Sequence, residues 1–541
     1  SWAEVDELLN RFAAAGSDRA QDYAVIKHII VHNLYGVDIE KQATEIAKLR
    51  LFLKPVALLE PGDEIEPLPD IDFNIRHGNT LVGYATADDT EKAVKGATQG
   101  NLFSDAWEDI RIRLVEVEQQ YNNFQIQQVQ QGGHVSATDK QALGAALSEL
   151  EEMLNYHLAR EYGVNTTKAK EFEAWKISHQ PFHWYVDFYP LMAVGGFDAV
   201  VGNPPYVEYS KVRGLYQVKG LETLESGNLY CYCIERLSAL CRDSSFSGLI
   251  VPIAIGSVSD TNILRKICSD LYGSLWSSHF AIRPAKLFDG VEQRLTILIG
   301  CHGPSDGNWY TSKYHQWFSE ERSELFSKII LVSMPPRLSE ESPWPKIGSV
   351  TEARILEKLR IFEGSPTHLL LTDSSKWVMY FHRTPGYWIR MLDFLPFFES
   401  PAGDRSVHHI RELYATSEAA RAEIAGLGSS SLYFWWFFAI GNCRNLTKGD
   451  LLGFPAPRLD AGGAVEIVRI FNELMKSYKD NSSVKSRAKA RYQEFDWVAA
   501  KPSVDAMDEF FAKVFGLTDE ELDFVINYDI KVRVGDVAEG I

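Results

Sequence analysis

Apolar residues in the first third of the chain recur at helical spacing in some segments and gather into short runs in others. Helical spacing covers residues 5–16, 21–33 and 40–59, and strand-like runs cover Asn33–Ile39 and Phe73–Tyr84. A strand–helix–strand order of this kind predicts a parallel, doubly wound α/β sheet.

A polar stretch with helical spacing interrupts the sheet pattern from about Asp105 to Tyr162, and a glutamine-rich segment at residues 125–133 breaks it in the middle. We interpret it as a helical hairpin within an insertion that covers about residues 105–178. This insertion could be a surface arm, or it could have a direct catalytic role.

The sheet pattern returns at residues 181–189 and at Phe197–Gly202, and a helical segment follows at residues 229–245. Two further apolar runs are predicted strands, Gly248–Ile255 and Arg294–Cys301.

The amino-acid composition of the chain changes beyond about Ser333. Residues 334–349 read MPPRLSEESPWPKIGS, and their proline and serine content is typical of a linker. Aromatic residues are dense at residues 377–398, and helices and turns follow. The sequence therefore predicts two domains, residues 1–332 and residues 333–541, of which the second has mixed α+β structure.

Composition and charge narrow the class of protein. Apolar runs such as Ser431–Gly441 are shorter than the ~20 residues that cross a bilayer, so no membrane partner is expected. The six cysteines form no Cys-x-x-Cys pair, which predicts neither a metal site nor a disulfide framework and fits a cytoplasmic protein. The net charge of −18 argues against a surface coated with nucleic-acid-binding charge but leaves room for a local basic face.

The apolar run Phe197–Gly202 ends in Asn203-Pro204-Pro205-Tyr206. Proline has no N–H to donate, so two prolines end a strand. Ligands of open α/β sheets bind at the carboxyl ends of the strands. A loop that only punctuates the chain is the alternative, because Asn-Pro commonly opens a turn.

These residue types suit a reaction at the exocyclic amino nitrogen of a heteroaromatic ring. Such a nitrogen is a poor nucleophile because its lone pair is delocalised. The side-chain oxygen of Asn203 and the carbonyl of Pro204 could accept its two hydrogens and free the lone pair. Tyr206 would stack on the ring, and Phe288 could close its other face. A sulfonium methyl donor would need only an in-line nucleophile.

Two further polar side chains stand at the ends of predicted strands. Asp38 could accept both ribose hydroxyls of an adenosine cofactor, with Ile39 packed on the adenine, or it could cap the next helix. Asn79 could hydrogen-bond the edge of the adenine, or it could belong to a plain Gly-Asn turn.

The chain resembles, over nearly its whole length, the amino-methyltransferases that methylate N6 of adenine in DNA. More narrowly, it is similar to the large methyltransferases of type II restriction–modification, including type IIG enzymes and related phage-defence methylases. The resemblance rests on the ordered motifs GVDI, HGN, FDAVVGNPPYVEY, LYCYCIERL, GLIVP and RPAKLFDGVEQRLTILIG. The later segment SLYFWWFFAIGNCRNLTKGDLLGFPAP resembles part of the family's target-recognition domain, and LTDEELDFVINYDIKVRVG resembles its carboxyl end.

The resemblance implies a Rossmann-like methyltransferase sheet, followed by a target-recognition domain. It implies S-adenosylmethionine as the methyl donor, with Asp38 at its ribose and with Ile39 and Asn79 at its adenine. Double-stranded DNA is the implied partner, together with a nuclease domain or subunit. The implied setting is the nucleoid of a prokaryotic cytoplasm, in restriction–modification or phage defence.

The resemblance also implies that the target adenine is flipped out of the duplex. The residues implied at that base are Asn203, Pro204, Pro205, Tyr206 and, as a stacking partner, Phe288.

In one respect the sequence departs from the family, which places a glycine-rich loop on the first strand, before the ribose acid. No such loop occurs between Ser1 and Leu34. We therefore expect a carboxyl-terminal portion, inactive by itself, whose first strand and cofactor loop lie upstream. The alternatives are a non-catalytic DNA-recognition portion, or an enzyme that acts on RNA or on a protein glutamine.

Basic residues alternate in the segment 476–492, which looks helical; they are Lys485, Arg487, Lys489 and Arg491. On a helix they would spread over one half of the surface and could contact DNA phosphates. A solvated helix face is the alternative.

Overall fold

The computed structural model describes residues 18–59, 70–96, 104–130, 136–304, 307–336, 339–362, 364–400, 410–456, 458–487 and 490–534. The helix predicted at residues 5–16 lies outside these residues. The chain forms two compact units, one of residues 1–200 and 204–247 and one of residues 201–203 and 248–541. This division falls near residue 247, whereas the sequence texture places a boundary near residue 332.

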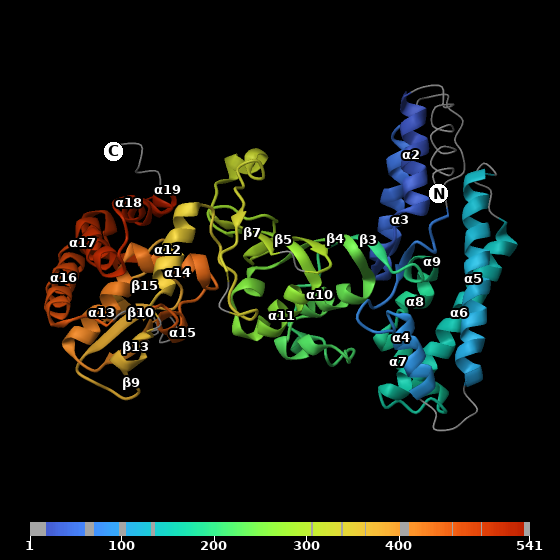
Figure 1. The fold of residues 1–541 in the computed structure, drawn as a ribbon, viewed down its shortest axis with the longest axis horizontal. Coiled ribbons are helices and arrows are strands. Elements are labelled where there is room, and N and C mark those ends of the chain that lie inside the picture. The colour runs from blue at the N-terminus through green and yellow to red at the C-terminus, as the bar shows by residue number, and fades with distance from the viewer. Residues whose placement is uncertain are drawn as a thin grey trace. The chain divides into compact units, whose positions relative to one another are not determined.

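The first unit is mostly helical (Figure 1). Its elements are α2 (Asp18–His32), β1 (Gly36–Asp38), α3 (Lys41–Val56), β2 (Ile75–His77), α4 (Ala87–Gly96), α5 (Ser104–Gln130), α6 (Ala137–Glu161), α7 (Ala169–His179), α8 (Trp184–Asp187), α9 (Tyr189–Met192), β3 (Phe197–Gly202), the 3-10 helices η1 (Tyr209–Lys211) and η2 (Glu222–Ser226), α10 (Leu229–Leu240) and the start of β4 (Cys241–Pro252).

The strands β1 and β2 pair in parallel, and α3 connects them and packs against both. This is the strand–helix–strand unit that the apolar pattern predicts, although each strand has only three residues. Ile30, Ile71 and Ile75 form a small core between α2 and this pair. Since parallel strands end at the same edge, residues that follow β1 and β2 lie close together.

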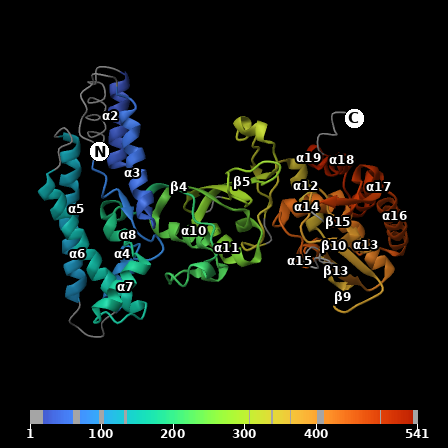
Figure 2. The same cartoon turned by 180° about the vertical axis from the view of Figure 1, so that it is seen from behind.

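Two long helices, α5 and α6, run side by side in the stretch with polar helical spacing (Figures 1 and 2). Their buried residues recur at intervals of three and four, which places one apolar stripe on each helix. These residues are Trp107, Ile110, Leu114, Val117, Tyr121 and Phe124 on α5 and Leu143, Leu147, Leu150, Leu154 and Leu158 on α6.

The strand predicted at residues 181–189 is wrong, because α8 and α9 occupy it. Its aromatic residues resemble a buried strand in sequence. In the structure, Phe182, Trp184 and Phe188 instead pack against one another in a small core. Tertiary packing therefore overrides local strand propensity here.

The larger sheet has six strands in the order β3-β4-β6-β5-β7-β8, with β5 (Tyr272–Phe280), β6 (Leu295–His302), β7 (Asn308–His315) and β8 (Val332–Ser333). β5 is antiparallel to β6 and parallel to β7, and β7 is antiparallel to β8. The sheet is therefore mixed, and the parallel order that the sequence predicts holds for β5 with β7 but not for the sheet as a whole. Among the described residues, β1 and β2 pair only with each other as a separate sheet.

The second unit continues with helices and two small sheets, β11-β10-β13-β9 and β12-β15-β14. Its other elements are η3 (Ile253–Gly256), η4 (Ser259–Thr261), α11 (Asn262–Leu271), η5 (Ser319–Glu324), α12 (Val350–Arg360), η6 (Pro366–Leu369), β9 (Leu370–Leu371), β10 (Val378–His382), β11 (Met391–Leu392), β12 (Phe398–Glu399), β13 (Ile410–Ala415), α13 (Glu418–Ser429), α14 (Ser431–Ile440), α15 (Lys448–Leu452), α16 (Ala461–Asp480), β14 (Ser482–Arg487), β15 (Ala490–Phe495), α17 (Trp497–Phe515), α18 (Asp519–Asn527) and α19 (Ile530–Val534).

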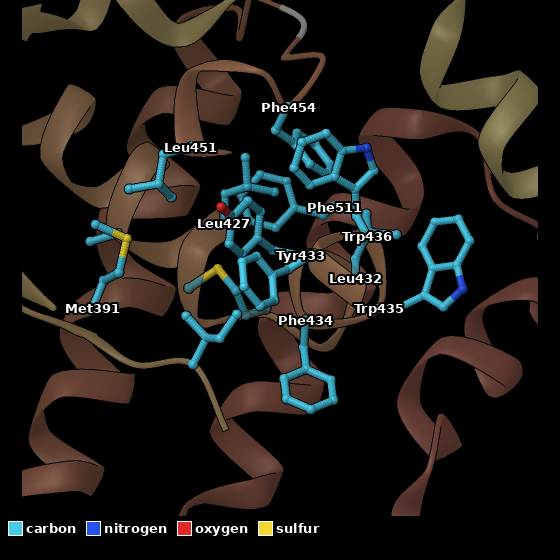
Figure 3. Packing of buried hydrophobic residues seen from close by; sticks show 14 of the residues in the cluster. Met391, Leu427, Leu432, Tyr433, Phe434, Trp435, Trp436, Leu451, Phe454 and Phe511 are labelled. Carbon is cyan, nitrogen blue, oxygen red and sulfur yellow. The ribbon is translucent and has the colours of Figure 1, made fainter. Parts of the chain in front are cut away.

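The core of the second unit surrounds α14, which is apolar on every side and therefore buried. Figure 3 shows Tyr433 and Trp436 within this core, where the two rings stack at 5.8 Å and Trp436 meets Phe454 edge to face at 5.1 Å. In the part of the chain that the structure describes, no helix has the length and apolar character needed to cross a membrane.

The proline- and serine-rich segment at residues 334–349 is not a linker. Trp344, Lys346 and Ile347 are buried within it. The Trp344 N–H donates to the Gly256 carbonyl at 2.7 Å, and the Lys346 ammonium donates to the Gly441 carbonyl at 2.9 Å. The prolines fix the backbone of a segment that packs into the unit, and composition alone does not distinguish this from an exposed connection.

Candidate functional site

The carboxyl ends of β1 and β2 bring the three predicted cofactor residues together. The parallel register places Asp38 beside His77, and the His77 imidazole Nε2 lies 3.1 Å from the Ile39 carbonyl oxygen. The exposed Asp38 carboxylate accepts the Glu40 N–H at 2.7 Å. Asp38 therefore does tie down the start of α3, and its other carboxylate oxygen has no hydrogen bond among the described residues.

Asn79 is buried, with 2 % of its surface exposed. Its side-chain oxygen accepts the Leu81 N–H at 3.1 Å, so the turn that the sequence allowed is present. Its Nδ2 is buried and has no hydrogen-bond partner among the described residues. An unpaired buried amide costs about 1–3 kcal/mol, so this nitrogen is a donor that a ligand could satisfy.

Gly78 lets the backbone approach a neighbouring aromatic residue closely. A Cβ atom at Gly78 would lie 2.8 Å from the Cβ of Phe182, which is closer than real contacts allow. The next residue, Asn79, bridges to Pro181 in parallel, and its N–H donates to the Gln180 carbonyl at 2.7 Å. This packing fixes the position from which the Asn79 amide points.

Arg76, the central residue of β2, forms two ion pairs that are largely buried. The Arg76 guanidinium contacts Asp187 at 2.9 Å and Glu151 at 2.6 Å. Burial raises the pKa of Asp187, and the Arg76 charge opposes that rise. Nearby, His183 accepts the Tyr84 N–H through Nδ1 at 3.3 Å, and burial lowers the pKa of His183 to about 4.

The Asn-Pro-Pro-Tyr segment follows directly on β3, as the sequence predicts. Asn203 and Pro205 are exposed, whereas Pro204 and Tyr206 are half-buried. Burial raises the pKa of Tyr206 to about 12, so the phenol is neutral at physiological pH. A neutral ring that is partly open to solvent can stack on a base without carrying a charge against it.

The loop that follows the segment is held by the start of α10. The Leu229 N–H donates to the Val207 carbonyl at 3.1 Å, and the Tyr209 N–H donates to the Gly227 carbonyl at 2.8 Å. The Glu235 carboxylate of α10 accepts the Thr223 N–H at 2.9 Å. Tyr206 thus leads into a loop with fixed backbone geometry.

Arg236 of α10 connects this loop region with the turn at Asn79. It is not among the residues that the sequence predicts for the site. Its Nη2 donates to the Leu81 carbonyl at 3.2 Å, next to the turn that the Asn79 oxygen closes. Burial lowers the pKa of Arg236, although arginine remains protonated. In the sequence, Arg236 could have been noticed as one of two charged residues, with Glu235, in the mainly apolar helix LYCYCIERL.

The structure brings together some of the predicted residues and leaves others apart. Pairing of Asp38 with His77 places Ile39 and Asn79 at the same edge, and these lie in the first unit together with the residues from Pro204 to Tyr206. Asn203 falls in the second unit, and so does Phe288, which is 37 % exposed on the segment between β5 and β6.

The helical interpretation of the basic segment is wrong. α16 ends at Asp480, and β14 and β15 then form an antiparallel hairpin. Lys489 and the Arg487 side chain lie outside the described residues. Paired residues share a face, so Lys485 lies with Tyr492 on one face, and Arg491 lies on the other with its carboxylate partner Glu399 at 2.9 Å.

The small sheets of the second unit enclose a cavity of about 760 Å³ that the sequence does not reveal. Side chains of β10, β13 and β15 line it, together with residues 384–386, 388–390 and 395–398. The aromatic density at residues 377–398 was the available signal, but aromatic runs more often fill a core than line a cavity.

One curated protein with similar sequence is named as a restriction enzyme and methyltransferase. A protein of Methanocaldococcus jannaschii, named as a type II restriction enzyme and methyltransferase, is 25% identical over 314 residues, which are 50% of this chain and 26% of that protein. The chain thus spans about a quarter of this relative.

Two solved structures of Type ISP restriction–modification enzymes have low overall similarity to the chain. The ATP-dependent enzyme LlaBIII bound to DNA has a TM-score of 0.30 and 11% identity, with 82% of this chain and 41% of that chain covered. A nuclease-deletion mutant of LlaGI with a DNA substrate mimic has a TM-score of 0.32 and 10% identity, with 88% of this chain and 62% of that chain covered.

One family of known proteins matches the part of the chain that carries most of the candidate site. The match covers residues 32–272, which is less than half of the chain. These residues include Asp38, Asn79 and Asn203 but not Phe288. The matching family is the Eco57I restriction-modification methylases, and the match supports a methyltransferase role for this part of the chain.

Proposed function

We propose that this chain is the catalytic and DNA-recognition portion of a site-specific DNA adenine-N6 methyltransferase of a restriction–modification or phage-defence system, with S-adenosylmethionine as methyl donor. The observation that carries the proposal is Asn-Pro-Pro-Tyr at the carboxyl end of β3, with the Asn203 amide exposed and the Tyr206 ring neutral and half-buried. This is an arrangement for accepting hydrogens from an amino group and stacking on its ring.

The residues at β1 and β2 fit the methyl donor. The free carboxylate oxygen of Asp38 can accept a ribose hydroxyl, and the unpaired Nδ2 of Asn79 can donate to an adenine ring nitrogen. When bound, S-adenosylmethionine supplies an electrophilic methyl group. The chain's own part is to hold the ribose and the adenine edge in fixed positions.

At the methyl acceptor, the role of the chain is to orient the amino group of the target base. The Asn203 Oδ1 and the Pro204 carbonyl each accept one hydrogen of the adenine N6 amino group, which draws the nitrogen towards tetrahedral geometry and localises its lone pair. Tyr206 stacks on the flipped base, and Phe288 serves as a second stacking residue. Because these residues only orient the amino group and its ring, this geometry does not require the enzyme to form a covalent intermediate.

The second unit supplies DNA contacts in this proposal, with the face of the β14–β15 hairpin that bears Lys485 against the phosphate backbone. A nuclease domain or subunit would act on the same DNA in the whole system.

A second candidate function is DNA recognition without catalysis. It is favoured by the separation of the sheets, since β1 and β2 pair with no strand of the six-stranded sheet among the described residues. Titration of the full-length parent protein with S-adenosylmethionine separates the two candidates, because only the methyltransferase needs that ligand.

The test of the main proposal is identification of the methylated product. The full-length parent protein is incubated with S-adenosylmethionine that carries a labelled methyl group and with duplex DNA, RNA or a protein in parallel, and the digested products are separated by mass spectrometry. Label in N6-methyladenine supports the proposal. Binding of both ligands with label only in another base, in RNA or in a protein glutamine would refute the adenine assignment.

A further inference from the structure

The cavity of the second unit has the size of a small-molecule site. Its volume of about 760 Å³ lies within the ~300–1,000 Å³ that is usual for such sites. All its lining residues belong to the second unit, so it does not overlap the residues Asp38, Asn79 and Tyr206 of the first unit.

Arg390 lies in the wall of the cavity with its hydrogen-bonding capacity unused. Its guanidinium packs over the Phe495 ring at 5.2 Å, and burial lowers the pKa of Arg390. In the described part of the chain, no side chain or carbonyl forms a hydrogen bond or ion pair with this guanidinium. Five N–H donors on a rigid, largely buried fork therefore face a space that a ligand can fill.

The cavity also offers aromatic faces that are not used for packing. Tyr380, Phe398 and Tyr492 line it, and none of them makes a ring–ring contact among the described residues. Tyr380 is paired with Glu412 across β10 and β13, so the two side chains share a face. Tyr492 and Glu494 are two positions apart on β15, so they share a face as well.

The charged side chains that line the cavity balance one another. Arg390 and Arg411 line it together with Glu412 and Glu494, and Glu494 interacts electrostatically with Arg390. Two carboxylates beside two guanidinium groups leave no net charge that would attract an anion. They favour a neutral planar ligand that has acceptors on one edge and N–H donors on the next.

We propose that this cavity binds a single unstacked guanine base. Guanine presents O6 and N7 as adjacent acceptors, which match the fork of Arg390, and its N1–H and N2–H groups can donate to the carboxylate of Glu494 or Glu412. Tyr380 or Tyr492 supplies a stacking face. Adenine has a donor where guanine has O6, so it fits the arginine fork less well.

Guanine could reach the cavity as a free nucleoside or as a base of single-stranded DNA, and one experiment separates the sources. The 541-residue chain is titrated, without any methyl donor, with guanosine, with adenosine, and with oligothymidylate that contains one guanine or one adenine. We expect guanine to bind about tenfold or more tightly than adenine in at least one of these two forms, because a bidentate base contact discriminates by ~1–3 kcal/mol.

Three variants tie the preference to the cavity. Arg390→Gln and Glu494→Gln should each remove most of the guanine preference. Arg383→Gln, an exposed arginine on the same segment but outside the lining residues, should retain it. Thermal unfolding checks that each variant folds. If Arg390→Gln does not fold, Glu494→Gln still tests the inference, because Glu494 is exposed and its replacement should not disturb the core.

Each result has a definite meaning. Preference for free guanosine assigns a nucleoside site, and preference for guanine only within the oligonucleotide assigns a nucleic-acid base. Equal binding of guanine and adenine, no binding of either, or a preference that survives both cavity variants would overturn the inference. Since no methyl donor is present, failure here would leave the proposed methyl transfer untouched.

Discussion

The β14–β15 hairpin allows DNA binding to be tested one side chain at a time. Lys485 lies 4.0 Å from Glu494, and both side chains are more than half exposed. Such a surface pair contributes ~0.2–1 kcal/mol, so a DNA phosphate can replace Glu494 at little cost. Arg491 differs, because its pair with Glu399 at 2.9 Å must open first, and its guanidinium also packs over Phe397 at 5.5 Å.

We therefore expect Lys485→Ala to reduce the slope of log affinity against log salt by about 0.9, the value for one phosphate contact. The loss of affinity should be the same for specific and random duplexes, because phosphates carry no sequence information. Arg491→Ala should change the slope less, because the Arg491 guanidinium is already paired with the Glu399 carboxylate.

Fluorescence anisotropy with labelled duplexes over a salt series measures these slopes. Lys476→Ala is the matched control: it changes the net charge equally, but Lys476 is 77% exposed on α16 and paired with Asp480 at 2.7 Å. An unchanged slope for Lys485→Ala, or an equal change for Lys476→Ala, would show that this face of the hairpin does not touch DNA.

Three further predictions concern the first unit and the segment after β3. In the full-length parent protein, Asn203→Ala should lower the rate of methyl transfer ~100-fold or more with nearly unchanged DNA affinity, because one oriented acceptor is lost; Ser210→Ala, exposed in the same loop, is the control, and near-normal turnover of Asn203→Ala would contradict the role. The chain should bind S-adenosylmethionine weakly or not at all, since no glycine-rich loop precedes Asp38; a micromolar affinity in titration calorimetry would contradict this. His183 has a folded-state pKa of about 4, below its ordinary value, so its neutral form stabilises the fold above pH ~6.5 and this stability is lost as the pH falls. Urea unfolding should show a loss of about 2 kcal/mol between pH 7 and pH 5 that is absent in His183→Gln, and equal pH dependence in both proteins would refute it.

Sequence patterns predicted local features best where one physical requirement dominates. β3 ends at Gly202 because the two prolines that follow Asn203 cannot pair, and β1 and β2 are parallel because α3 connects them. The alternating basic residues failed as evidence, because a period of two also fits a strand and the hairpin register decides which face each residue occupies.

Long-range packing accounts for what the sequence could not show. Arg236 reaches the Leu81 carbonyl from 155 positions away, and no local pattern encodes that distance. The unused guanidinium of Arg390 likewise depends on what lies around it in space. The candidate site residues at the strand ends could be predicted from the sequence, whereas the residues that support them and the cavity could be identified only from the structure.

The burial of residues 344–347 bears on how such proteins exchange specificity. Trp344 meets Trp309 edge to face at 5.7 Å and bonds to Gly256, so residues on both sides of position 332 share one core. A recombination event that replaced only residues 333–541 would set a foreign Trp344 against native partners. Gene segments that travel between relatives should therefore retain the strands from β5 to β7 together with the helices they pack against, and hybrids joined near residue 332 should misfold unless the partners of Trp344 and Lys346 are transferred as well.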